Sequence, residues 1–224
     1  RDSIIYLRGT MTNLLIRVII ILLAIIVVIA TSLYAYLQQP QFVNPVLNAT
    51  NLAPNGAIYD GERFINLEPT EVDTAQKKSS AVEGFYNFMF KNIPGAKPEF
   101  SLPSKKTDLH ALSSEQDVIV WLGHSSYFIQ LAGKRLLIDP VFSENASPVP
   151  HTNVTFLGSN IYQADDMPDI DYLLITHDHW DHLDYPTIKS LQPKVEKVIT
   201  PLGVGSYFTQ WGYEPERVFS GDWH

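Results

Sequence analysis

Histidine and aspartate gather in the short stretch His177-Asp-His-Trp-Asp-His182, which holds three of the seven histidines of this chain. An apolar run at 172–175 precedes the stretch and is typical of a buried strand. His177 and His179 are two residues apart, so in an extended backbone both imidazoles point the same way and can share a metal ion at about 2.0–2.1 Å. Asp181 and His182 follow the turn and can reach a second ion. We therefore predict that these four residues bind metal.

The donor types narrow the chemistry of this site. Neutral imidazole with carboxylate suits zinc, and iron and manganese stay open as alternatives. The chain of 224 residues has no cysteine, which excludes a thiolate zinc site, an iron–sulfur cluster, a disulfide scaffold and a cysteine nucleophile. Two ions about 3.5–4 Å apart would hold a hydroxide between them and clamp the attacking and leaving oxygens of a hydrolysis. This pattern predicts a metal-dependent hydrolase.

Two residues outside the stretch are candidates to support the ligands. Asp139 ends a strand in Ile-Asp-Pro, where it could fix the tautomer of a ligand histidine or only cap a turn before proline. His124 follows Gly123 at a strand boundary, where it could line the site or make a structural hydrogen bond. We expect Asp184 to cap the next helix rather than bind metal.

The elements that must position these residues follow an α/β order. A hairpin opens the pattern, and strands and helices then alternate, which predicts a mixed sheet. The expected strands are 118–122, 126–131, 135–139, 171–176, 197–200 and 217–220, and the expected helices are 79–92, 185–191 and 204–211.

The N-terminal region has a different character. Residues 18–37 carry no charge, and at about 1.5 Å per residue such a helix crosses a hydrocarbon core of about 30 Å. Three arginines precede the run and no charge follows it until Asp60, which predicts a cytoplasmic N-terminus with the remainder outside the cytoplasm. The alternative is a cleaved signal peptide, which would leave a periplasmic or secreted protein. The expected organisation is an anchor or signal segment at 1–37, a linker at 38–58 and a metal-binding domain at 59–224.

Composition excludes several classes of protein. Hydrophobic residues make up 45% of the chain, enough to bury a core, which rules out a disordered tail. The formal net charge of −8 argues against nucleic acid as a partner, because binding phosphates requires a basic surface. Nothing in the composition determines the oligomeric state.

The spacing His177-x-His179-x-Asp181-His182 resembles the signature of the metallo-β-lactamase superfamily. Further segments resemble one branch of it, which holds the N-acyl-phosphatidylethanolamine-hydrolysing phospholipase D and its bacterial relatives. These segments are Trp-Leu-Gly-His-Ser-Ser at 121–126, Leu-Ile-Asp-Pro-Val-Phe at 137–142, and the stretches 143–150, 169–176 and 221–223. Residues 60–66 resemble the opening of the bacterial members.

The resemblance implies an αββα sandwich of four layers, with two zinc ions at the sheet edge. By position His177 and His179 would bind the first zinc, and Asp181 and His182 the second, with Asp181 also orienting the bridging water as a catalytic residue. The implied substrate is a membrane lipid or another phosphodiester or ester. A lactonase or amide hydrolase of the same fold is one alternative, and a membrane-attached protein that binds metal without catalysis is another.

The resemblance also implies ligands that lie beyond the printed sequence. The family uses a third histidine, a bridging aspartate and a further histidine, all C-terminal to the segment that ends here, and the position of His224 does not match. We therefore expect the domain at 59–224 to be incomplete at its C-terminus. Residues 1–224 alone should then lack hydrolase activity and bind zinc poorly, since a catalytic zinc normally has three protein ligands.

Overall fold

The computed structural model describes residues 2–47, 58–59, 64–65, 80–91, 94–147 and 151–222. The chain divides into two compact units, residues 1–44 and residues 45–224. Residues 48–57 of the predicted linker at 38–58 lie outside the described residues. So do residues 60–63, 66, 148–150 and 223 of the family-like segments, and His224. The predicted domain boundaries stay predictions.

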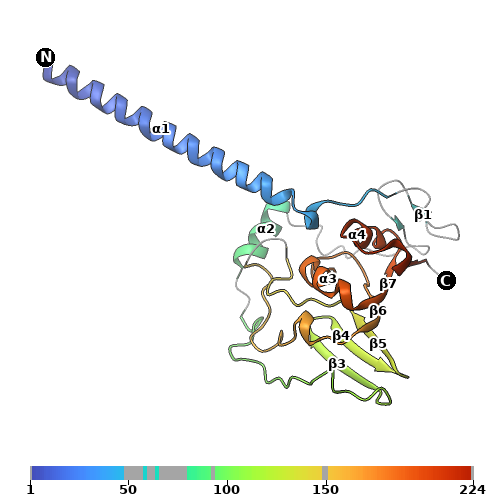
Figure 1. Ribbon diagram of the computed structural model, residues 1–224. Coiled ribbons are helices and arrows are strands. Elements are labelled where there is room, and N and C mark those ends of the chain that lie inside the picture. The colour runs from blue at the N-terminus through green and yellow to red at the C-terminus, as the bar shows by residue number, and fades with distance from the viewer. Residues whose placement is uncertain are drawn as a thin grey trace. The chain divides into compact units, whose positions relative to one another are not determined.

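The first unit is dominated by one long helix, α1 (Asp2–Leu37), which is drawn in blue in Figure 1. Its part Asn13–Leu37 is long and apolar enough to cross a membrane, and none of this part is buried. The Thr31 hydroxyl donates to the Val27 carbonyl at 2.7 Å, so the helix satisfies this polar group itself, as a span through lipid requires. A signal sequence meets the same criteria of length and composition, so membrane attachment stays a proposal.

The second unit is built on a six-stranded sheet with the order β3-β4-β5-β6-β7-β8. The first three strands pair antiparallel, and the pairs from β5 to β8 are parallel. The mixed sheet expected from the sequence is thus present. Its strands are β3 (Val118–Gly123), β4 (Ser126–Leu131), β5 (Lys134–Ile138), β6 (Ile170–Leu174), β7 (Val195–Pro201) and β8 (Val218–Gly221).

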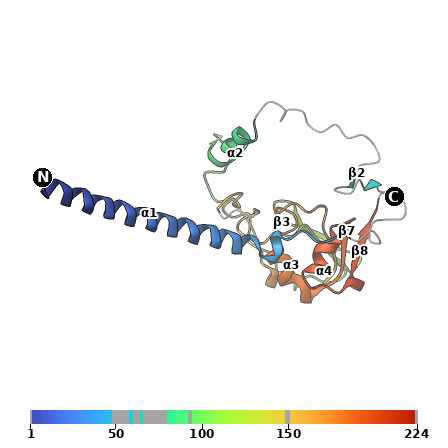
Figure 2. The ribbon, with the colours of Figure 1, turned by 90° about the horizontal axis from the view of Figure 1, so that it is seen from above.

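Three helices in this unit were expected, and all three form close to their expected bounds. These are α2 (Ala81–Phe90), α3 (Tyr185–Leu191) and α4 (Gly205–Gln210), of which α3 and α4 lie beside β7 and β8 in Figure 2. Helix α2 begins after Ser80, whose hydroxyl accepts a hydrogen bond from the Glu83 N–H at 3.1 Å. That contact satisfies one of the backbone donors that every helix start leaves free.

The sheet buries one of its faces under α3 and α4. In β4, Ser126, Phe128 and Gln130 are buried while Tyr127 and Leu131 are exposed, which is the alternation of a strand with one covered face. Apart from the short pair β1 (Ile58–Tyr59) and β2 (Phe64–Ile65), the described residues hold no second sheet. The four-layer sandwich therefore stays an expectation.

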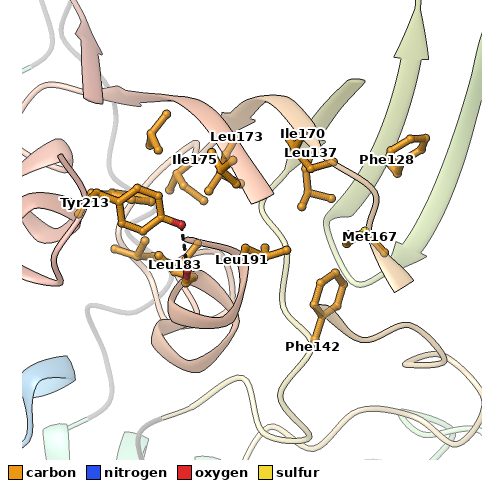
Figure 3. Close-up of a cluster of buried hydrophobic side chains, with 14 of the residues drawn as sticks. Phe128, Leu137, Phe142, Met167, Ile170, Leu173, Ile175, Leu183, Leu191 and Tyr213 are labelled. Atoms are coloured by element: carbon orange, nitrogen blue, oxygen red, sulfur yellow. Dashed lines mark hydrogen bonds between the residues drawn. The ribbon is translucent and has the colours of Figure 1, made fainter. Parts of the chain in front are cut away.

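The core between sheet and helices is drawn in Figure 3. Leu137, Leu173 and Phe128 from the strands pack in one cluster with Leu191 from α3. Tyr213 is also buried there, and its hydroxyl donates to the Ile188 carbonyl at 2.8 Å, the dashed line in Figure 3. Burial raises the pKa of Tyr213, which keeps this hydroxyl protonated as a donor. The packed layer holds the strand ends in fixed positions.

Candidate metal centre

Three strands bring their C-terminal ends to one edge of the sheet. β5 and β6 are parallel, and β3 runs in the direction of β5 because both pair antiparallel with β4. His124 follows β3, Asp139 follows β5, and the stretch 176–182 follows β6. Ligands in open α/β sheets bind at such an edge. The topology therefore collects residues far apart in the chain, such as His124 and Asp181, which are separated by 57 positions.

Asp139 is the buried anchor of this edge. Its carboxylate accepts hydrogen bonds from the Thr176 N–H at 2.8 Å and from the Thr176 hydroxyl at 2.7 Å, and it contacts His182 Nδ1 at 2.9 Å. A carboxylate only accepts, so Nδ1 of His182 carries a proton, and in the neutral ring Nε2 is then the nitrogen that can bind metal. This contact is the one expected of Asp139 as a partner to a ligand histidine, and that role stays a prediction.

The Thr176 hydroxyl assigns the tautomer of His177 in the same way. This hydroxyl has one proton and donates it to Asp139, so it accepts from His177 Nδ1 at 3.0 Å. His177 then presents an unprotonated Nε2. Burial, followed by the nearby charges of His182 and His179, lowers the pKa of His177, which favours the neutral, ligating form.

His124, Asp181 and His182 form a group that can bind a metal ion. His124 Nε2 lies 3.0 Å from Asp181 Oδ2, and His182 Nε2 lies 3.9 Å from the same oxygen. One ligand atom from each residue falls within 4.8 Å of the others. An ion at about 2.1 Å from each atom would need them within roughly 4.2 Å of one another, a small closing movement. Two imidazoles and one carboxylate are a donor set that zinc, iron and manganese all accept.

His177 and His179 lie beside this group. The ring centroid of His177 is 3.9 Å from that of His182 and 4.6 Å from that of His179. Among the described residues, one group of three has its ligand atoms within 4.8 Å of one another, and it consists of His124, Asp181 and His182. His177 and His179 do not belong to that group. The structure thus brings all the predicted ligands to one place, and the binding of metal by each stays a prediction.

The charge of Asp181 suits the role of a ligand. Partial burial acts to raise the pKa of Asp181. Its own backbone N–H, the hydrogen bond with His124 and the nearby charge of His182 outweigh burial and hold the pKa below its usual range. Asp181 is therefore a carboxylate at neutral pH, and it is positioned to bind a cation.

Backbone geometry at this edge is unusual at two of the site residues. His124 has a φ of 43° and Asp139 a φ of 42°, in the left-handed region that non-glycine residues rarely adopt. Such conformations cost on the order of 1–3 kcal/mol and gather at functional sites. The observed strain is consistent with a site whose side chains must point in fixed directions.

Asp184 lies directly after the candidate metal-binding stretch and connects helix α3 to the loop after β5. Its buried carboxylate accepts from the Ser143 hydroxyl at 2.9 Å, from the Ser143 N–H at 3.2 Å and from the Thr187 hydroxyl. It occupies the N-cap position of α3, yet no backbone N–H of the helix bonds to its side chain, so the expected capping contact is absent. Burial raises the pKa of Asp184 despite these donors. The residue ties α3 to the loop after β5.

Sequence reasoning missed Thr176 and gave His124 only a supporting place. Thr176 lies directly before the first histidine, but its contacts are with Asp139, 37 positions earlier in the chain. The spacing of neighbouring residues cannot reveal such a contact. The contact of His124 with Asp181 spans 57 positions. Both residues follow strands of one sheet edge, and that shared position was the available signal.

Residues 134–222 match the family model described as β-lactamase superfamily domain. The match begins with β5 and includes Asp139 and the whole stretch 176–182. It leaves out His124.

Several proteins resemble this chain in sequence. An uncharacterized protein of Mycobacterium tuberculosis is 27% identical over 74% of this chain and 44% of its own length. The N-acyl-phosphatidylethanolamine-hydrolyzing phospholipase D 1 of Caenorhabditis elegans is 30% identical over 54% and 36%. A UPF0173 metal-dependent hydrolase of Caldivirga maquilingensis is 43% identical over 28% and 22%. The chain spans less than half the length of these relatives.

Among solved structures, the crystal structure of CmlA, a diiron β-hydroxylase from Streptomyces venezuelae, is similar to part of the chain. The likeness covers 48% of this chain and 21% of that one, at 28% identity and a TM-score of 0.37. The sequence matches, together with the donor set at the sheet edge, support a β-lactamase superfamily domain in residues 134–222, with metal-dependent hydrolases among its relatives.

Proposed function

We propose that this protein is a zinc-dependent hydrolase of the metallo-β-lactamase kind. Its centre would be His177, His179, Asp181 and His182, with His124 as a further ligand once its Nε2 loses the proton that it donates to Asp181. The observation that carries the proposal is the group His124, Asp181 and His182, with Asp139 fixing His182 from behind. Histidines that bind metal through one ring nitrogen commonly donate the N–H of the other ring nitrogen to such a carboxylate.

Each residue has a distinct task in this proposal. The tautomers assigned above leave Nε2 of His177 and of His182 free to bind metal, and the Asp181 carboxylate is charged. When bound, a divalent metal ion supplies a Lewis acid and lowers the pKa of a water molecule towards neutrality. Asp181 would help to hold the ion, because its Oδ2 lies 3.0 Å from His124 Nε2 and 3.9 Å from His182 Nε2. The family resemblance implies that Asp181 would also orient the attacking water.

We further propose a phosphodiester, of the kind that a phospholipase D cleaves, as the substrate class. Support comes from the likeness to the phospholipase of Caenorhabditis elegans, whose name gives N-acyl-phosphatidylethanolamine as its substrate. A panel of a phosphodiester, a lactone and an amide tests this point with the full-length protein. If the protein hydrolyses only the lactone or only the amide, the phosphodiesterase proposal is wrong and the lactonase or amide hydrolase takes its place.

Metal content gives the direct test of the centre. We expect about two zinc ions per chain in the full-length protein, and a loss of at least one in His177→Ala and in Asp181→Ala, because each removes a ligand. Elemental analysis after gel filtration measures this. Asp178→Ala is the matched control, since Asp178 is an exposed carboxylate in the same loop. Unchanged metal in both ligand variants would refute the assignment.

We also propose that α1 anchors the protein in a membrane, with the metal-binding domain outside the cytoplasm. The support is the apolar stretch Asn13–Leu37, with arginine on its N-terminal side and no charge after it until Asp60. We expect the protein to stay in the membrane fraction after carbonate extraction and to be digested by protease added from outside intact cells. A carbonate-soluble product that lacks residues 1–37 would show signal cleavage instead.

A further inference from the structure

A cavity of about 470 Å³ opens beside His177, at the sheet edge that carries the candidate metal centre. Its volume falls in the range of roughly 300–1,000 Å³ that small-molecule sites occupy. The lining comes from residues 176–178 after β6, from the loop and helix after β7, and from Pro45, Leu47 and Phe64. The cavity therefore adjoins the place where a metal ion would hold the reacting group of a substrate.

Packing against the loop after β7 gives this cavity its shape. At Gly203, with a φ of +83°, a Cβ atom would lie 2.8 Å from Phe64 Cε2 and 3.6 Å from Leu47 Cδ1. Glycine tolerates this φ and leaves room for such a close approach. In helix α4 the ring of Tyr207 packs against buried Trp211, with ring centroids 5.4 Å apart. These contacts hold two aromatic side chains, Phe64 and Tyr207, in the cavity wall.

The full charge in the lining has one sign. Among the described residues that line the cavity, Asp178 is the one carboxylate, and there is no glutamate, lysine or arginine. His177 is neutral in the metal-binding form assigned above. Asp178 is exposed, and no described residue forms a salt bridge with it. The cavity thus offers a negative charge that no basic side chain in the described part of the chain neutralises.

The aromatic wall adds a second preference for a cation. Phe64 and Tyr207 are both half-buried, so each keeps part of its ring surface accessible. Burial, followed by the charge of Asp178, raises the pKa of Tyr207, so its phenol stays neutral close to that carboxylate. A cation is attracted by the face of an aromatic ring, and aromatic side chains bind quaternary ammonium groups in this way. A neutral group of the same shape gains neither attraction.

We propose that this cavity binds the cationic head group of a substrate whose phosphodiester lies at the metal centre. The substrate class is then a phosphodiester of an amino alcohol that carries an ammonium group. The proposal rests on the proposed hydrolase for the reacting group, and the cavity adds the charge of the head group. Asp178, Tyr207 and Phe64 are its specificity-determining residues.

Two molecules of the same shape separate the effect of charge from that of size. Choline carries a quaternary ammonium group, and in its uncharged analogue dimethylbutanol a carbon atom replaces the nitrogen. We expect calorimetric titration of the full-length protein, with its metal bound, to show at least ten-fold tighter binding of choline. Both molecules carry the same hydroxyl, so any binding of that hydroxyl to a metal ion cancels in the comparison.

Variants then assign the preference to this cavity. Asp178→Asn keeps the size of the side chain but removes its charge, so it should weaken choline binding at least ten-fold and leave dimethylbutanol binding unchanged. Asp165→Asn is the matched control, because Asp165 is an exposed aspartate outside the lining, and it should change choline binding less than two-fold. Tyr207→Phe keeps the ring and should retain choline binding, whereas Tyr207→Leu should weaken it about two- to five-fold.

Two results would overturn the proposal. One is equal binding of choline and dimethylbutanol by the wild-type protein, a comparison that needs no variant to fold. The other is a loss of choline binding of the same size in Asp178→Asn and Asp165→Asn. If metal analysis and phosphodiester turnover succeed without a preference for choline, the hydrolase stands and the head-group site is wrong. Selective choline binding without any hydrolysis would keep the cation site and refute the hydrolase.

Discussion

Replacing His182 by alanine in the full-length protein should lower kcat/KM for phosphodiester hydrolysis by at least about a thousand-fold. His182 presents Nε2 to the group that includes Asp181, and its Nδ1 contacts Asp139 at 2.9 Å. The substitution therefore removes one metal ligand and the contact that makes Asp139 part of the centre. Initial rates over a range of substrate concentrations measure the effect.

The control for this variant is another histidine outside the centre. His110 is exposed and its Nε2 lies 3.4 Å from the Asp165 carbonyl, so His110→Ala should leave kcat/KM within two-fold. Adding zinc in excess should not rescue His182→Ala if the ligand itself is needed. Full activity in His182→Ala would contradict the assignment of His182 to the centre.

Replacing Asp139 by alanine should destabilise the fold by about 1–3 kcal/mol, the range for leaving hydrogen-bond donors without their acceptor. The change removes a buried carboxylate and leaves the Thr176 N–H, the Thr176 hydroxyl and His182 Nδ1 without this acceptor. The free energy of unfolding from urea titration of metal-free protein checks this, because no metal then contributes.

Asp139→Asn separates folding from metal affinity. Asparagine keeps the size of the side chain and tolerates the φ of 42°, but its amide group places a donor where one carboxylate oxygen accepts. We expect a smaller loss of stability and a metal affinity lowered about 10–100-fold, measured by chelator competition. A double-mutant cycle with His182→Ala should give a coupling of about 0.5–3 kcal/mol, and additive effects would show that the two residues act independently.

The expected strands and helices agree with the structure because their signals are local. Alternation in 126–131 reports which face of β4 is covered, and the proline at the start of 185–191 marks where α3 begins. No bound shifts by more than two residues. The alternation cannot say what covers the second face of the sheet, since that depends on contacts from elsewhere in the chain.

The sequence by itself determined the residue types of the candidate centre and the order of the elements that carry it. His177, His179, Asp181 and His182 lie within six positions, so their closeness follows from covalent geometry. Only the tertiary structure decided which distant groups meet them. Asp139 reaches His182 across 43 positions and His124 reaches Asp181 across 57, because β3, β5 and β6 end at one sheet edge. Strand order is set by packing between segments far apart in the chain, which periodicity within one segment does not encode.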